Sequence, residues 1–151
     1  MREIYVVFHG NSKYFGSKYL EPGFTHVFVI ERCARGWTCI DGNRSSLEIK
    51  ILPISNQIDM MPEYVNQNPS AHVLKIYASD PERSKYPSFG MLSCVSTVQY
   101  ILGIYYPSVI TPYALYNKLL DNRINHLEVF NYGRQTRRSK KGRGVFGASC
   151  S

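Results

Sequence analysis

The sequence predicts an α+β fold, because β-forming segments dominate the first half of the chain and helical patterns follow them. Residues 24–52 contain three β-rich runs separated by Gly- and Asn-containing turns, which is the pattern of an antiparallel meander. Residues 93–102 and 112–121 instead carry apolar side chains at helical spacing. An apolar content of 44% over 151 residues favours one packed domain and excludes wholesale disorder.

The expected strands are short runs rich in β-branched and aromatic residues. The run 24–31 is apolar on both faces except at Thr25, His26 and Glu31, so we expect it in the interior of the sheet. The run 47–52 alternates apolar and polar residues, which predicts a half-exposed strand. The full set of expected strands is 1–8, 24–31, 37–41, 47–52, 72–77 and 127–132.

Two helices are expected in the second half of the chain. Gly103 ends the first helix, and Thr111 caps the second, with Pro112 at its first position. The loops 53–70, with one helical turn, and 79–89 are predicted from their prolines. The side chains expected to be buried by these helices are Val95, Val98, Ile101, Leu102, Leu115, Tyr116 and Leu119.

Positive charge is concentrated near the C-terminus. Six basic residues lie in the window 134–143, whereas all eleven acidic residues precede it. The remaining twelve basic residues nearly balance those acids, so the sequence predicts a nearly neutral domain over 1–133 and a basic, Gly-rich tail over 134–151. The tail suits nucleic-acid phosphates, an acidic surface of another protein, or an anionic cell wall; the alternative is a tail that only aids solubility.

The four cysteines are expected to be free thiols. Their spacings match neither a zinc site nor a compact disulfide framework. The N-terminus lacks the apolar segment of a secretory signal, and the apolar runs are too short to span a bilayer. The sequence also lacks the GxGxxG, Walker and HExxH motifs. We therefore expect synthesis in the cytoplasm, no membrane span, no cofactor and no metal.

Cys94 and His26 are the residues that suggest chemistry. Cys94 lies at the start of a predicted helix, where the helix dipole and unpaired N–H groups stabilise a thiolate and a developing oxyanion. His26 interrupts an apolar strand, and its imidazole is suited to accept the thiol proton. The alternatives are a buried structural cysteine and a histidine that only completes the sheet.

The predicted hairpin suggests where an orienting partner for His26 lies. If Glu31 pairs with Trp37, then His26 lies opposite position 42, within a residue or two. Residues on either side of that position have side chains that accept an imidazole N–H. Ordinary turn chemistry is the alternative explanation for Asp and Asn at this point. The candidates, in falling order of expectation, are Asp41 and Asn43, followed by Thr38 and Glu31.

The order of these motifs resembles a known family. A His-bearing strand (25–31), a Trp-bearing return strand ending in Asp (37–41) and a helix opening Ser-Cys-Val (93–95) follow one another. Leu-Gly-Ile (102–104) and Thr-Pro-Tyr-Ala-Leu-Tyr (111–116) come after them. This arrangement is similar to the circularly permuted branch of the NlpC-like, papain-fold cysteine hydrolases, and particularly to its small phage and bacterial members.

The resemblance implies a small antiparallel sheet packed against the Cys-bearing helix. It implies Cys94 as nucleophile, His26 as base and Asp41 as the residue that orients His26, although Gly42 replaces the proline that follows this Asp in the family. The implied activity is hydrolysis of a peptide or amide bond, including bonds of peptidoglycan. The phage relatives also imply a virion-associated protein, and the alternative function is a non-catalytic structural or adaptor component of a phage particle.

Overall fold

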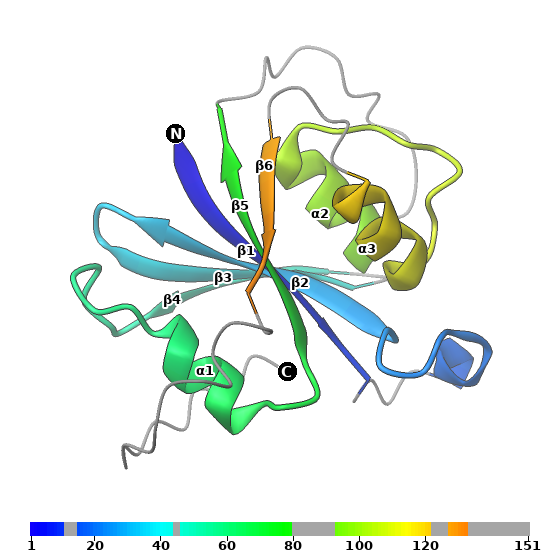
Figure 1. The fold of residues 1–151 in the computed structure, drawn as a ribbon, viewed down its shortest axis with the longest axis horizontal. Coiled ribbons are helices and arrows are strands. Elements are labelled where there is room, and N and C mark those ends of the chain that lie inside the picture. The colour runs from blue at the N-terminus through cyan, green and yellow to red at the C-terminus, as the bar shows by residue number, and fades with distance from the viewer. Residues whose placement is uncertain (11–14, 44–45, 80–92, 122–126, 133–151) are drawn as a thin grey trace.

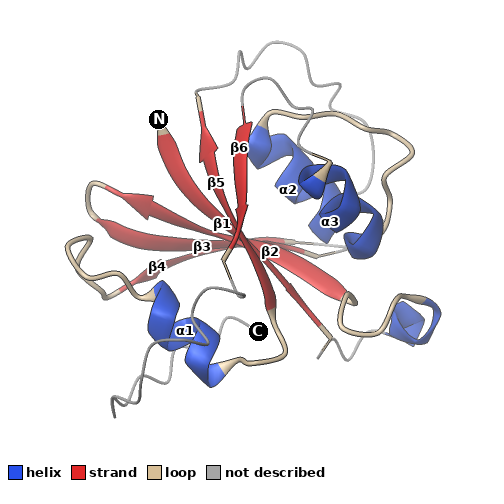
Figure 2. Ribbon diagram, in the orientation of Figure 1, coloured by secondary structure: helices blue, strands red, loops and turns tan. Residues whose placement is uncertain are grey.

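The computed structural model describes residues 1–10, 15–43, 46–79, 93–121 and 127–132. These residues form one six-stranded antiparallel sheet with three α-helices and a short 3-10 helix (Phe15–Tyr19), as Figures 1 and 2 show. The predicted α+β class is therefore confirmed. The expected loop over 79–89 beyond residue 79 and the basic tail 134–151 lie outside the described residues.

Each expected strand is present, with ends that differ from the prediction by at most two residues. The order of the strands across the sheet is β4-β3-β2-β1-β5-β6, so β2 lies in the interior, as its apolar run predicts. The strands are β1 (Arg2–His9), β2 (His26–Cys33), β3 (Gly36–Gly42), β4 (Leu47–Leu52), β5 (His72–Ala78) and β6 (Leu127–Asn131).

The predicted register of the β2–β3 hairpin is wrong by one residue. Trp37 pairs with Arg32 rather than with Glu31, because Cys33 pairs directly with Gly36 across a tight two-residue turn. Gly36 adopts a φ of 135°, a backbone conformation that glycine tolerates and that other residues rarely adopt. A glycine at this position therefore permits a shorter turn than the sequence pattern suggests.

The sheet has an apolar core on each face. The face that carries Val6, Val29 and Ile76 packs against helices α2 (Cys94–Leu102) and α3 (Pro112–Leu120). The opposite face carries Tyr5 and Trp37 and packs against α1 (Met61–Gln67). Alternate residues of β1, β2, β3 and β5 thus contribute to different cores.

The helices begin and end largely where the sequence predicts. The Ser93 hydroxyl caps α2, and Gly103 ends it in the left-handed region, while Thr111 caps α3. The region 53–70 differs from the prediction, since α1 (Met61–Gln67) is a full seven-residue helix. Within the described ranges, none of the helices has the length and apolar character needed to cross a membrane.

The exposure of β4 also differs from the prediction. A half-exposed strand was expected to turn its apolar side chains inward, yet Leu47, Ile49 and Ile51 are all exposed. The reason is position, because β4 is the outermost strand and α2 packs mainly on β2 and β3.

Candidate active site

Cys94 is the first residue of α2, as the sequence predicts. Its sulfur is half-buried, and it packs at the edge of the core beneath α2 and α3. Ser93 and Ser96 form a reciprocal capping box, in which the Ser96 N–H donates to the Ser93 hydroxyl. The N–H groups of Cys94 and Val95 lie outside this cap and at the positive end of the helix dipole.

His26 and Asp41 are brought together by the sheet. The Nε2 atom of His26 lies 2.8 Å from Oδ1 of Asp41, and both side chains are largely buried, at 18% and 17% exposed. Burial alone lowers the pKa of His26. The hydrogen bond to Asp41, the interaction with Cys94 and the charges of both groups outweigh burial and raise the pKa of His26 to about 9.

The hydrogen bond to Asp41 gives the two ring nitrogens of His26 different tasks. Because Nε2 faces Asp41, Nδ1 is the nitrogen that remains for a second partner, and the Cys94 thiol is the other group that raises the pKa of His26. A carboxylate on one side of an imidazole fixes its orientation and stabilises its protonated form. The Cys94 cluster, meaning Cys94, His26 and Asp41, therefore has the order nucleophile, base and orienting group.

The separation of β2 and β3 places α2 beside His26. The last described pair between these strands is Val29 with Ile40, yet β2 continues back to His26 and β3 continues to Gly42. Helix α2 packs against both strands at this end. Its N-terminus can therefore meet the diverging strands, so that residues 26, 41 and 94 converge although they are far apart in sequence.

Gly42 is the residue that permits this close approach. A Cβ atom at position 42 would lie 2.0 Å from Oγ1 and 2.6 Å from Cβ of Thr97, one turn after Cys94. Both distances are far below contact distance, so any side chain here would displace α2.

His9 is a neighbour of His26 that the sequence analysis missed. It pairs with His26 across β1 and β2, and the two rings meet edge to face with centroids 5.3 Å apart. Burial lowers the pKa of His9, and the charge of His26 lowers it further. No turn pattern links residues 9 and 26, so their alignment could be found only from the pairing of β1 with β2.

The other candidates for the orienting residue have partners elsewhere. Asn43 accepts hydrogen bonds from the backbone N–H and the hydroxyl of Ser46, as expected for turn chemistry. Glu31 accepts two hydrogen bonds from Arg2 at the far end of β2. Thr38 lies 3.8 Å from the Cys33 sulfur. Asp41 is the one of these four that contacts His26.

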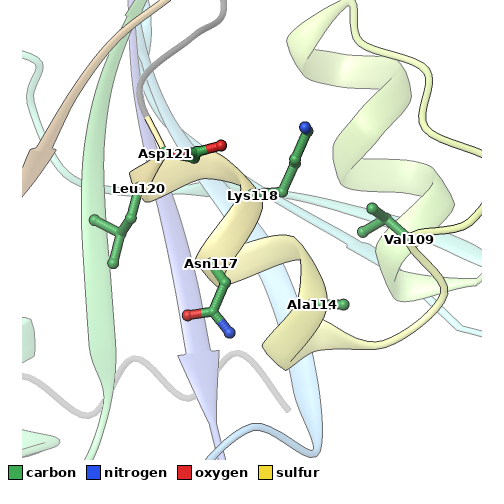
Figure 3. A pocket seen from close by; sticks show the side chains of 6 residues that line it. All are labelled: Val109, Ala114, Asn117, Lys118, Leu120 and Asp121. Carbon is green, nitrogen blue, oxygen red and sulfur yellow. The ribbon is translucent and has the colours of Figure 1, made fainter.

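A shallow hollow of about 540 Å³ lies elsewhere, along α3 (Figure 3). Its lining includes Val109, Lys118 and Asp121 and shares no residue with the Cys94 cluster. The hollow therefore contains none of the groups of the Cys94 cluster. Among the residues that the structure describes, no three His, Cys, Asp or Glu side chains are grouped so that they could hold a metal ion.

The fold and this cluster define an α+β protein with a cysteine at a helix start beside a His–Asp pair. Comparisons with protein-family models, curated proteins and solved structures find no match. Further conclusions about function therefore depend on the chemistry of the cluster itself.

Proposed function

We propose that this chain is a cysteine-dependent hydrolase of the permuted NlpC-like, papain-fold kind, acting on a peptide or amide bond. The observation that carries the proposal is that His26 binds Asp41 through Nε2, while Cys94 at the start of α2 acts on the same imidazole and raises its pKa. A histidine that only filled the sheet would need neither a carboxylate partner nor a helix-start thiol beside it. The arrangement of the helix against the antiparallel sheet supports the same proposal.

In the proposed reaction, His26 holds the proton of Cys94, in the form that its raised pKa favours, and the Cys94 thiolate attacks the carbonyl carbon of the substrate to form a tetrahedral intermediate. The N–H groups of Cys94 and Val95 stabilise its oxyanion in this proposal. His26 gives its proton to the leaving amine as the intermediate collapses to a thioester. His26 then takes a proton from water, whose oxygen attacks the thioester, and the acid leaves as the Cys94 thiolate and protonated His26 are restored.

The direct test is hydrolysis of purified peptidoglycan and of a mixed peptide library by the full chain, with products read by mass spectrometry. Cys94→Ala and His26→Ala should each abolish cleavage while the circular dichroism spectrum stays unchanged. Cys33→Ala is the matched control, because Cys33 is exposed and lies outside the cluster. Cleavage by Cys94→Ala at the rate of the unmodified chain would rule out the mechanism.

A second candidate function is a structural or adaptor role in a phage particle. The concentration of six basic residues in 134–143, outside a nearly neutral domain, favours it. Its test is the binding of duplex DNA and of an acidic polypeptide as salt is raised. This role predicts a steep salt dependence that disappears when residues 134–151 are deleted, together with no cleavage in the first test. Affinity that deletion leaves unchanged would contradict it.

A further inference from the structure

The edge strand β4 combines apolar exposure with an ordered charge pattern. Its Leu47, Ile49 and Ile51 side chains are 46%, 59% and 77% exposed and lie on one face. Its Glu48 and Lys50 lie on the other face, joined by a 3.2 Å ion pair. An exposed apolar edge strand is a surface on which another strand can pair.

The backbone of β4 offers hydrogen bonds at the same three apolar residues. The turn before β4 is closed by a hydrogen bond from Asn43 N–H to the Ser46 carbonyl. Backbone groups alternate in direction along an antiparallel strand, so residues 48, 50 and 52 face β3. The N–H and C=O groups of Leu47, Ile49 and Ile51 therefore point away from β3, outward from the edge of the sheet.

The sequence of β4 is complementary to itself in one antiparallel register. If Ile49 pairs with Ile49 of a second copy, then Glu48 lies opposite Lys50 of that copy, and Lys50 lies opposite its Glu48. Leu47 then lies opposite Ile51 of the second copy, and the apolar side chains form one row.

Two neighbouring registers also keep the apolar side chains in one row, but they place like charges opposite one another. A shift of two residues places Glu48 opposite Glu48 of the second copy, or Lys50 opposite its Lys50. Like charges directly opposite one another destabilise a sheet. A shift of one residue places the apolar side chains of the two copies on opposite faces. The charge pattern thus permits one register and disfavours its neighbours.

We propose that β4 is a homodimerisation edge, at which two copies of the chain pair antiparallel about a two-fold axis at Ile49. The two sheets become continuous, and the apolar row of each copy extends that of the other. Charge complementarity of β4 with itself is the reason to choose a second copy rather than an unrelated strand. The inference is independent of the proposed hydrolase activity.

Sedimentation velocity of the full chain over a concentration series tests this proposal. The unmodified chain should form dimers. Lys50→Glu and Glu48→Lys should each weaken association about tenfold or more, because two attractive pairs become repulsive. The double variant Glu48→Lys/Lys50→Glu should restore it, since reversal keeps every pair opposite in charge. Ile49→Lys should remove association.

Each single variant also breaks the ion pair within its own strand. Thermal unfolding at a concentration where the chain is monomeric therefore accompanies each measurement, so that weaker association is read from a folded chain. Lys50→Glu is the cleaner single variant. Asp41 lies opposite Glu48 on β3, so Glu48→Lys would also change a charge pair within one chain. A monomeric unmodified chain at its highest soluble concentration, or a double variant that associates no better than the singles, would overturn the proposal.

Discussion

The two ends of β1 carry polar clusters of opposite character. At its start, Glu3 accepts hydrogen bonds from Lys75 at 2.6 Å and Tyr5 at 2.8 Å and lies 3.5 Å from Arg32. At its end, His9 meets the His26 ring, which joins Asp41 and Cys94. The Glu3 cluster, meaning Glu3, Tyr5, Arg32 and Lys75, contains neither a thiol nor an imidazole, whereas the Cys94 cluster contains both.

The difference shows that a shifted pKa alone does not mark a reactive site. Burial and the Glu3 hydrogen bond raise the pKa of Tyr5. Burial lowers the pKa of Lys75, but its interactions with Glu3 and the tyrosines outweigh burial and raise that pKa. Both groups are thereby held further from titration at neutral pH. His26 instead has a pKa of about 9, where it can both give and accept a proton. We therefore expect the Glu3 cluster to support stability and the Cys94 cluster to support activity.

The largest expected effect is that of removing the Cys94 thiol, which should change activity and leave stability nearly unchanged. Cys94→Ala should lower turnover by about 10⁴-fold or more, since it removes the proposed nucleophile. The midpoint of thermal unfolding should change little, because the half-buried sulfur loses few contacts. Enzyme assay and calorimetry on the same preparation check both expectations. A variant that unfolds but whose folded fraction remains active would reverse the assignment.

Asp41→Asn should have the next largest effect. The amide keeps the shape of the side chain but loses the charge that favours protonated His26, so turnover should fall roughly 10²-fold. The pKa of His26 should fall from about 9 toward its ordinary value of 6.5. Titration of the histidine ring resonances by NMR measures this change, and Asn43→Ala is the control. An unchanged His26 titration in Asp41→Asn would contradict the proposed pairing.

The comparison between the clusters also predicts opposite responses to pH. The raised pKa of His26 means that its stabilising contribution is complete below about pH 6.5 and is lost as the pH rises through about 9. The pKa of Glu3 is lowered: burial raises it, but the hydrogen bonds and charges of Lys75, Tyr5 and Arg32 outweigh burial. Its contribution is therefore complete above about pH 4.5 and is lost as the pH falls.

Denaturant unfolding measured across this pH range checks the signs. Asp41→Asn should flatten the alkaline limb of the stability profile, and Glu3→Gln should flatten the acidic limb. Glu3→Gln should also cost about 1–3 kcal/mol at neutral pH while leaving turnover unchanged. If Glu3→Gln lowered turnover as strongly as Asp41→Asn, the division between the two ends of β1 would be wrong.

Gly42→Ala tests whether close packing positions the Cys94 cluster. The new Cβ overlaps the Thr97 side chain, so α2 must move, at a cost of about 1–3 kcal/mol in unfolding free energy. Turnover should fall as well, because Cys94 begins the helix that moves. Calorimetry and activity assay measure the two effects. Gly103→Ala is the contrasting variant, since it strains the C-terminal cap of the same helix without crowding β3.

The smallest expected effect concerns His9. His26→Gln removes a charge that lowers the pKa of His9, so the pKa of His9 should rise slightly toward its ordinary value. The NMR titration used for Asp41→Asn measures this shift, and a fall in the pKa of His9 would contradict the expected electrostatic coupling.

The sequence predicted much of this arrangement because local patterns determine it. The Gly103 end of α2 and the Thr111 cap of α3 depend on nearby residues, and both predictions are confirmed. The expected register placed Asp41 and Asn43 equally near His26, and only the three-dimensional divergence of β2 and β3 distinguishes them. The His9 contact and the exposure of β4 depend on strand order, which is a long-range property.

Alkylation of the cysteines by iodoacetamide tests the central claim most directly. Peptide mass spectrometry resolves Cys94 from the exposed Cys33 and the buried Cys39 in one sample. At about pH 6, where ordinary thiols react slowly, Cys94 should be labelled faster than Cys33, and His26→Ala should remove that advantage. If Cys94 reacts more slowly than Cys33 at every pH and His26→Ala leaves its rate unchanged, the Cys94 cluster is not a nucleophilic site.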